Sequence, residues 1–204
     1  MVHQRRPVVG TLAGQVVEES VSHDLKRTAE PAGNDFFKEG KTVMATNHDI
    51  INELTKSYAM ELETVENYLA NSIDLDGVRA EEIKKALLRD IEEELGHARK
   101  LGNRIKVLEG RVPGSLDLDR AQRYLQPPKD STDLIAVIRG VIRAEEEAIH
   151  QYKKLIKMCD PVDLVTQDLI LEITAEEQAH RRQFIGFLYE YERGEAKRLT
   201  AAAA

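Results

Sequence analysis

Four glutamates of this chain fall on helix faces that are otherwise apolar. Apolar residues that recur every three or four positions mark the buried face of a helix. One such stripe passes through Leu54 and includes Glu61, and another passes through Ile138 and includes Glu145. A buried carboxylate is costly unless it is paired or binds a cation. The chain must therefore fold around something that compensates these charges.

Two Glu-x-x-His motifs supply the other two glutamates. Glu94 and His97 lie within one apolar helical pattern, and Glu177 and His180 lie within another. Residues three positions apart share a helix face, so each motif can direct both of its side chains to one point.

The spacing of these residues repeats along the chain. Glu61 precedes Glu94 by 33 residues, and Glu145 precedes Glu177 by 32. The repeat predicts two similar helical hairpins, each with one lone glutamate and one Glu-x-x-His motif. A twofold arrangement of the hairpins would gather six side chains at mid-height of a bundle. These six candidate ligands are Glu61, Glu94, His97, Glu145, Glu177 and His180.

A third Glu-x-x-His copy, Glu147 and His150, falls on the opposite side of its helix from Glu145. It is predicted to face solvent, because charged helix residues usually lie in water. Six neighbouring glutamates are expected to be surface charges as well: Glu63, Glu66, Glu92, Glu93, Glu146 and Glu176. Of these, Glu146 or Glu176 could replace the adjacent ligand after a small rotation of its helix.

The ligand types favour iron or manganese. Carboxylates with one imidazole per metal suit these ions, and the absence of thiolates argues against a soft-metal site. Two divalent cations would balance four carboxylates. Tyr68 and Tyr152 each lie seven residues after a lone glutamate. Two roles are open for them: core tyrosines, or hydroxyl donors to the ligand carboxylates.

Four helical patterns are separated by two short links and one long connection. The connection, residues 111–130, contains Pro113, Gly114, Pro127 and Pro128, which disfavour a helix. We predict an all-α four-helix bundle with a long crossover between helices two and three; an ordinary up-and-down bundle is the alternative. The predicted helices span about residues 49–72, 78–109, 131–158 and 162–191.

The bundle is expected to occupy residues 47–193. Residues 1–46 read as an N-terminal extension that is poorly structured or holds a short helix near Val16–Lys26, and residues 194–204 as a C-terminal tail. Thr46 to Asp49 offer helix caps at the boundary between extension and bundle.

Composition excludes several classes of protein. The net charge of −7 does not suggest a nucleic-acid partner and suits small cations. The single cysteine, Cys159, excludes an intrachain disulfide and any CxxC motif. No apolar run approaches the roughly 20 residues of a membrane span. The N-terminus is a poor secretion signal, so a cytoplasmic location is expected.

The second-helix residues resemble bacterioferritin. The resemblance rests on Glu94-x-x-His97-Ala98-x-x-Leu101, and it continues to Gly110. Glu145-x-x-Ala148-Ile149-x-x-Tyr152 with Glu176-Glu177-x-x-His180 looks more like the Dps-like, bacterioferritin-related proteins. The resemblance implies a ferritin-like bundle whose six candidate ligands bind two irons, with Glu94 and Glu177 as the bridging carboxylates.

Three departures from these families narrow the expectation. Leu95 stands where bacterioferritins carry the haem-binding methionine, so no haem is predicted. Glu147 stands where thioferritins carry a cysteine of their redox pair. Little sequence after Tyr191 remains for the short fifth helix of 24-subunit shells, which argues against a shell of that size. The predicted assembly is a homo-oligomer, from a dimer up to a 12- or 24-subunit cage.

The leading functional hypothesis is a ferroxidase that oxidises Fe²⁺ with O₂ or H₂O₂, for iron storage, detoxification and protection from oxidative stress. One alternative is a rubrerythrin-like di-iron peroxidase or oxidase in a small oligomer, without mineral. Another is a Dps-like DNA-protecting shell, which Arg5 and Arg6 support only weakly because acidic residues are interleaved with the basic ones. A metal-free structural bundle is the fourth.

Overall fold

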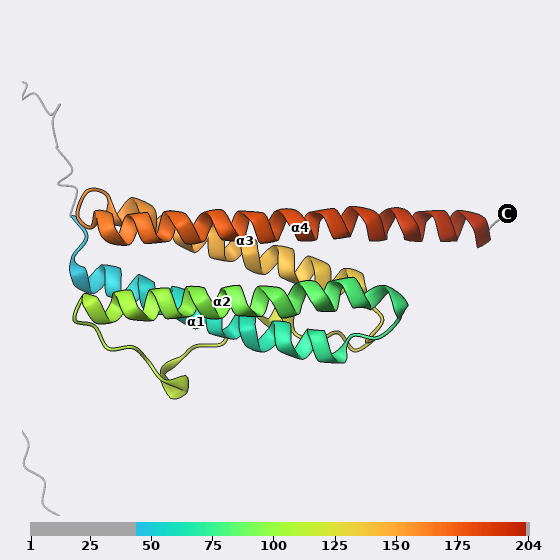
Figure 1. Ribbon diagram of the computed structural model, residues 1–204, viewed down its shortest axis with the longest axis horizontal. Helices are drawn as coiled ribbons and strands as arrows, with labels where there is room; N and C mark the ends of the chain where they lie inside the picture. The colour runs from blue at the N-terminus through green and yellow to red at the C-terminus, as the bar shows by residue number, and fades with distance from the viewer. Residues whose placement is uncertain (1–43, 203–204) are drawn as a thin grey trace, which may run out of the picture. The chain divides into compact units, whose positions relative to one another are not determined.

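Four long helices make up most of the described chain (Figure 1). The computed structural model describes residues 44–202, and this part of the chain holds no strand. The helices are α1 Asn47–Asp74, α2 Glu81–Val107, α3 Leu134–Cys159 and α4 Leu164–Ala202. The all-α prediction is confirmed. The predicted N-terminal extension, including the short helix near residues 16–26, lies outside the described residues except for positions 44–46.

Side chains at the predicted boundary start α1. The Thr46 hydroxyl accepts a hydrogen bond from the Asp49 amide at 3.2 Å, and the Asp49 carboxylate accepts one from the Thr46 amide at 2.9 Å. This reciprocal pair is a capping box, which satisfies amides that the first turn leaves unpaired. At α3, the Asp133 carboxylate accepts from the Ala136 amide at 3.0 Å. Both helices therefore begin where a short polar side chain caps them.

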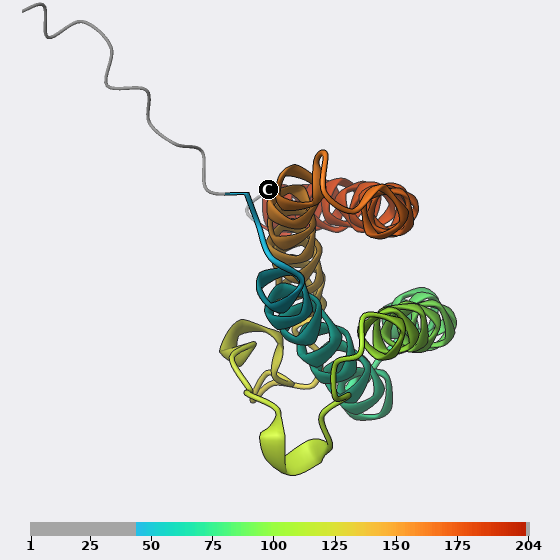
Figure 2. The same ribbon diagram turned by 90° about the vertical axis from the view of Figure 1, so that its left-hand side faces the viewer.

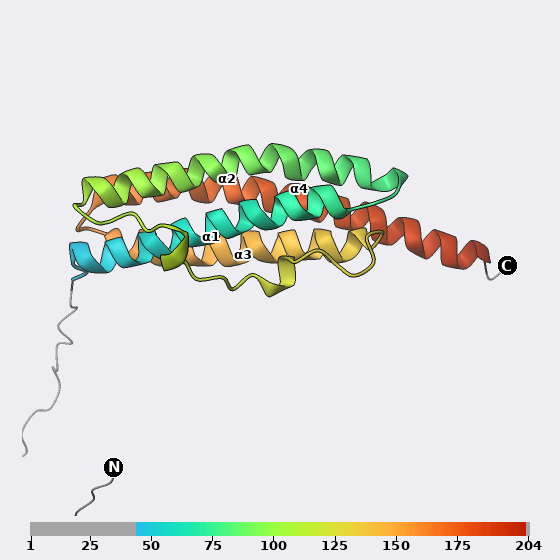
Figure 3. The ribbon, with the colours of Figure 1, turned by 90° about the horizontal axis from the view of Figure 1, so that it is seen from below.

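The helices pair as two antiparallel hairpins, α1 with α2 and α3 with α4 (Figures 1 and 3). Helix α1 also packs against α3, which joins the two hairpins. A view along the bundle shows the four helices around a common centre, with the crossover outside them (Figure 2). The buried side chains of each helix therefore lie inside the bundle, between the hairpins.

The segment between α2 and α3 runs back along the bundle beside α1 (Figures 1 and 3). It contains two short 3₁₀ turns, Ser115–Asp117 and Arg123–Leu125. At Gly140 an added Cβ would lie 2.8 Å from the Tyr124 carbonyl oxygen, so a side chain there would clash with the crossover. The predicted long crossover is confirmed, and the ordinary up-and-down bundle is not observed.

The expectation that Glu63 is a surface charge is wrong. Glu63 is buried, and its two carboxylate oxygens accept hydrogen bonds from the backbone amides of Ala121 and Gln122 at 2.9 and 2.8 Å. The crossover covers this face of α1, which a helical periodicity taken alone leaves exposed. Glu63 therefore fastens the crossover to the bundle.

Two apolar clusters fill the bundle on either side of its middle. One cluster includes Leu87, Ile91, Ile138, Val141 and Phe184. The other includes Leu54, Leu101, Ile105, Leu155 and Ile173. The six candidate ligands occupy sequence positions between these two groups on every helix, so the core is apolar above and below a polar layer.

Helix α4 does not end near Tyr191, as the sequence pattern predicts, but continues to Ala202 beyond the other helices (Figures 1 and 3). The residues after Tyr191 are mostly good helix formers and contain no proline, so nothing in them stops the helix. The Arg79 guanidinium lies 4.1 Å from the centre of the Tyr191 ring.

Within residues 44–202 no helix combines the length and apolarity needed to cross a bilayer.

Candidate metal centre

All six candidate ligands are buried, and their side chains lie together in the polar layer. None of them is more than 5% exposed. They form two overlapping groups, and in each group one potential ligand atom per residue lies within 4.8 Å of the others. The first group is Glu61, Glu94, His97 and Glu177; the second is Glu94, Glu145, Glu177 and His180.

Glu94 and Glu177 belong to both groups. The Nδ1 atom of His97 lies 3.2 Å from Glu94 Oε2 and 3.0 Å from Glu177 Oε1. The Nδ1 atom of His180 lies 3.4 Å from Glu94 Oε1 and 3.4 Å from Glu177 Oε2. Each of these carboxylates therefore presents one oxygen to each imidazole, which is the placement that a bridging carboxylate requires.

Each tyrosine crosses from one hairpin to the other. The Tyr68 hydroxyl of α1 donates to Glu145 of α3, and the Tyr152 hydroxyl of α3 donates to Glu61 of α1. Both tyrosines are almost fully buried. The sequence left their role open between packing and donation; the structure gives them both, because each ring lies in the core and each hydroxyl orients a lone glutamate.

Sequence reasoning missed the carboxylates on the far side of the imidazoles. His97 Nε2 lies 2.6 Å from Glu176 Oε2, and His180 Nε2 lies 2.8 Å from Glu93 Oε2. These contacts cross between α2 and α4 in both directions. A carboxylate on one ring nitrogen fixes the tautomer and leaves the other nitrogen free to bind. The Glu-Glu-x-x-His pattern, present in both motifs, was the signal that could have found them.

The neighbouring glutamates that the sequence offered as alternative ligands, and the third motif copy, lie outside the cluster. Glu146 pairs with Arg181 on the surface, with its Oε1 2.6 Å from the Arg181 Nη2. The third motif copy is also at the surface: Glu147 pairs with Arg143 at 3.0 Å, and His150 is exposed. Neither Glu146 nor Glu176 belongs to the two ligand groups.

Carboxylates surround each imidazole and stabilise its charged form. Burial opposes that charge, but Glu177 and Glu94 outweigh it and raise the pKa of His97 to about 10. The same two glutamates, against the same burial, raise the pKa of His180 to about 12. Burial also opposes the charge on Glu94, but the adjacent imidazoles of His180 and His97 hold its pKa at about 2.

The two lone glutamates shift in the opposite direction. Burial, then the charges of Glu177 and Glu94, raise the pKa of Glu61 well above its ordinary value. Burial, then Glu94 and Glu177, do the same to the pKa of Glu145. Both shifts favour the protonated form of the carboxyl, so a divalent cation entering the cluster competes with protons.

Several polar atoms of the cluster lie near a charged group but make no hydrogen bond of good geometry in the described chain. They are Glu94 Oε1, both carboxylate oxygens of Glu177, and His180 Nδ1. Buried polar atoms are nearly always hydrogen-bonded, and an unsatisfied group calls for an explanation such as an ion. All three residues belong to the ligand groups, and an ion bound there would supply the missing partners. The donor set, four carboxylates and two imidazoles, fits two iron or manganese ions.

The family model for ferritin-like domains matches residues 51–193, which is most of the chain. The chain belongs to the ferritin-like family. No curated protein sequence matches it. The resemblance noted from the motifs is thus confirmed at the level of the family, and this ferritin-like protein carries a buried cluster that can hold metal ions.

Solved structures share the fold. A ferritin-like di-iron-carboxylate protein from Bacillus anthracis str. Ames has a TM-score of 0.62 at 20% identity, over 70% of this chain and 96% of that one. The bacterioferritin-related protein of Bacteroides fragilis, a dodecameric thioferritin, has a TM-score of 0.63 at 22% identity, over 75% and 92%. Desulfovibrio desulfuricans bacterioferritin has 0.60 at 24%, over 72% and 82%.

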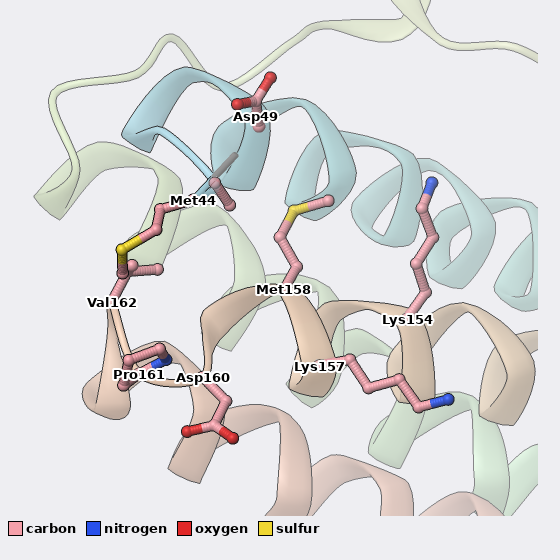
Figure 4. Close-up of a pocket in the computed structure, with 9 residues that line it drawn as sticks. Met44, Asp49, Lys154, Lys157, Met158, Asp160, Pro161 and Val162 are labelled. Atoms are coloured by element: carbon pink, nitrogen blue, oxygen red, sulfur yellow. The ribbon is translucent and has the colours of Figure 1, made fainter. Parts of the chain in front are cut away.

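An open pocket of this ferritin-like protein lies away from the cluster, where the start of α1 meets the turn between α3 and α4 (Figure 4). Its volume is about 700 Å³, and Met44, Met158 and Val162 supply its apolar lining. Lys154 and Lys157 extend from α3 beside it (Figure 4). None of the six candidate ligands lines this pocket, so it is separate from the candidate metal centre.

Proposed function

We propose that this ferritin-like protein is a non-haem di-iron ferroxidase that oxidises Fe²⁺ with O₂ or H₂O₂. The observation that carries the proposal is the pair of ligand groups that share Glu94 and Glu177. Bound iron supplies the one-electron chemistry, since each Fe²⁺ gives up one electron. With H₂O₂ as oxidant, two Fe²⁺ and two protons yield two Fe³⁺ and two waters.

The residues divide the binding between two positions. Glu61 with His97, and Glu145 with His180, would each hold one ion at the end of the cluster. Glu94 and Glu177 would join the two positions. Once ionised, the four carboxylates would carry a charge that two divalent cations balance, which would offset the repulsion among them.

The surrounding residues keep the ligands in place. The Tyr68 and Tyr152 hydroxyls each donate to one oxygen of a lone glutamate and so orient its carboxylate. Glu93 and Glu176 hold the Nε2 atoms of the imidazoles, so that the Nδ1 atoms would be the ones to bind the ions. The apolar clusters on either side limit access of water to the centre.

Ferrous iron added anaerobically, followed by O₂ or H₂O₂, tests this function. We expect a ferric absorbance that saturates at about two irons per chain. A Glu94→Ala, His97→Ala variant should lose it. The matched control is Glu147→Ala, His150→Ala, which removes the exposed copy of the same motif and should keep it. An unchanged absorbance in the first variant would contradict the site.

We further propose that the protein acts as a homo-oligomer. Leu88 and Leu95 of α2 are seven residues apart and are 50% and 36% exposed, so they form an apolar strip on the outer face of the helix. One structural relative is named as dodecameric. The mass of the assembled particle, measured with its iron content, separates a storage cage from a small peroxidase-like oligomer that retains no mineral.

A further inference from the structure

The internal repeat of the bundle is broken at one buried position. The repeat matches Glu94 with Glu177 and Glu93 with Glu176, and one turn earlier it matches Asp90 with Ile173. Asp90 and Ile173 are both fully buried, at 0% exposure. A carboxylate thus stands in the core on the α2 side where the α4 side has an isoleucine.

Asp90 is only half satisfied by its neighbours. Its Oδ1 accepts a hydrogen bond from Arg89 Nη2 at 2.9 Å, whereas its Oδ2 has no partner in the described chain. A buried charged oxygen without a partner costs free energy, and no packing need explains it. A leucine or isoleucine at this position would fill the core as Ile173 does.

The unpaired carboxylate lies beside two other potential ligands. Asp90, Glu93 and His180 each place one ligand atom within 4.8 Å of the others. Glu93 is 45% exposed, so this group connects the buried layer with solvent. The matching place on the other side offers only Glu176 and His97, because Ile173 has no ligand atom. The side-chain chemistry therefore differs between the two halves of the bundle.

We propose that Asp90, Glu93 and His180 form an accessory site for a hard divalent cation, on the His180 side of the bundle alone. Carboxylate oxygens are the preferred ligands of Mn²⁺ and Fe²⁺, and one imidazole is compatible with both. A divalent cation balances the two carboxylates and gives Asp90 Oδ2 its missing partner.

His180 determines how the accessory site relates to the main centre. A neutral imidazole has one nitrogen free of protons. The Nδ1 atom of His180 faces the centre, and its Nε2 atom faces Glu93. It therefore completes the accessory site through Nε2 only while its Nδ1 binds nothing. When the centre is full, Asp90 and Glu93 hold the third cation with water, and the affinity is lower. This relation rests on the proposed function; the binding of a cation at Asp90 does not.

Arg89 opposes the accessory site. Its guanidinium contacts Asp90 and also lies 4.0 Å from Glu93 Oε1, and it donates to Gln183 at 2.7 Å. The side chain is 54% exposed, so it can leave when a cation arrives. Arg89 thus supplies a positive charge to the same carboxylates that a cation would use, and its removal should strengthen cation binding.

Anaerobic titration with Mn²⁺, followed by electron paramagnetic resonance of the unbound ion, tests the proposal. Wild type should bind two Mn²⁺ per chain and a third more weakly. Asp90→Asn should bind only two, and Arg89→Gln should bind the third several-fold more tightly. The matched control, Glu92→Gln, removes one negative charge from an exposed neighbour on α2 and should still bind three.

A crystal soaked in Mn²⁺ locates the third ion directly. An anomalous peak beside Asp90 in wild type, absent from Asp90→Asn, supports the proposal. Two ions in wild type, or three in Asp90→Asn, would overturn it. Fewer than two ions in wild type would instead contradict the proposed function. Thermal unfolding of chelator-treated Asp90→Asn tests for a folding defect. An unchanged or higher unfolding midpoint supports a cation-binding role for Asp90, and a lower midpoint indicates a structural role instead.

Discussion

At the residue scale, the two imidazoles of the centre face carboxylates on both ring nitrogens. Nδ1 of each ring faces Glu94 and Glu177, and Nε2 faces a glutamate of the opposite hairpin. This surrounding charge keeps both rings protonated near neutral pH. A cation must displace those protons, so metal binding and proton release are linked.

This linkage predicts proton release on metal binding. At pH 7 the imidazoles of His97 and His180 favour their protonated forms, and burial raises the pKa of the Glu61 and Glu145 carboxyls above its ordinary value. Calorimetry of Mn²⁺ binding in buffers of different ionisation enthalpy should show release of several protons for two ions. The affinity for Mn²⁺ should rise with pH, because fewer protons then compete with the ion. Binding without proton release would contradict the arrangement of charges.

The same pKa shifts predict how the chelator-treated protein responds to alkali. The folded chain holds the His97 proton to about pH 10, whereas an unfolded histidine loses it near 6.5. The stabilisation is therefore complete below pH 6.5 and disappears as pH rises through 10. The thermal midpoint should fall between pH 7 and pH 10, and a constant or rising midpoint would contradict this.

The carboxylates behind the imidazoles give a third prediction at this scale. Glu176→Gln or Glu93→Gln should weaken metal binding by about 10- to 100-fold, because each removes the group that orients a ligand ring. Glu92→Gln is the control for charge alone. Equal affinities in the Glu176 and Glu92 variants would indicate that the ring contacts do not matter.

At the scale of elements, the crossover depends on one buried carboxylate. Glu63→Ala removes the acceptor of two backbone amides and leaves them unsatisfied, which costs about 1–3 kcal/mol per buried group. Denaturant unfolding should show a loss of that order. Glu66→Ala breaks an exposed pair with Arg120 and should cost less than about 1 kcal/mol. Similar losses in both variants would contradict the role of Glu63.

The elements also show what periodicity can and cannot predict. The four helices and the long crossover follow from local patterns, since caps, prolines and apolar stripes are local properties. The end of α4 does not, because no stop residue follows Tyr191. The burial of Glu63 and the contacts of Glu93 and Glu176 depend on segments distant in sequence, so a single-helix pattern assigned them to the surface.

At the scale of the whole molecule, the internal repeat explains why the clustering of the six side chains could be predicted from the sequence. One Glu-x-x-His motif is uninformative, as the exposed pair Glu147 and His150 demonstrates. Two motifs with matched lone glutamates define a twofold arrangement, and the structure brings the six side chains together as that arrangement requires. The crossed tyrosine contacts follow the same symmetry, and Asp90 departs from it.

Iron-edge anomalous diffraction from crystals loaded anaerobically with Fe²⁺ is the most direct test of the di-iron site. We expect two peaks between Glu94 and Glu177, one near His97 and one near His180. Both should be lost from Glu94→Ala, His97→Ala crystals and retained when Glu147 and His150 are replaced. Loaded crystals without iron at this position, or with iron only on the surface, would show that the six residues are not the iron ligands.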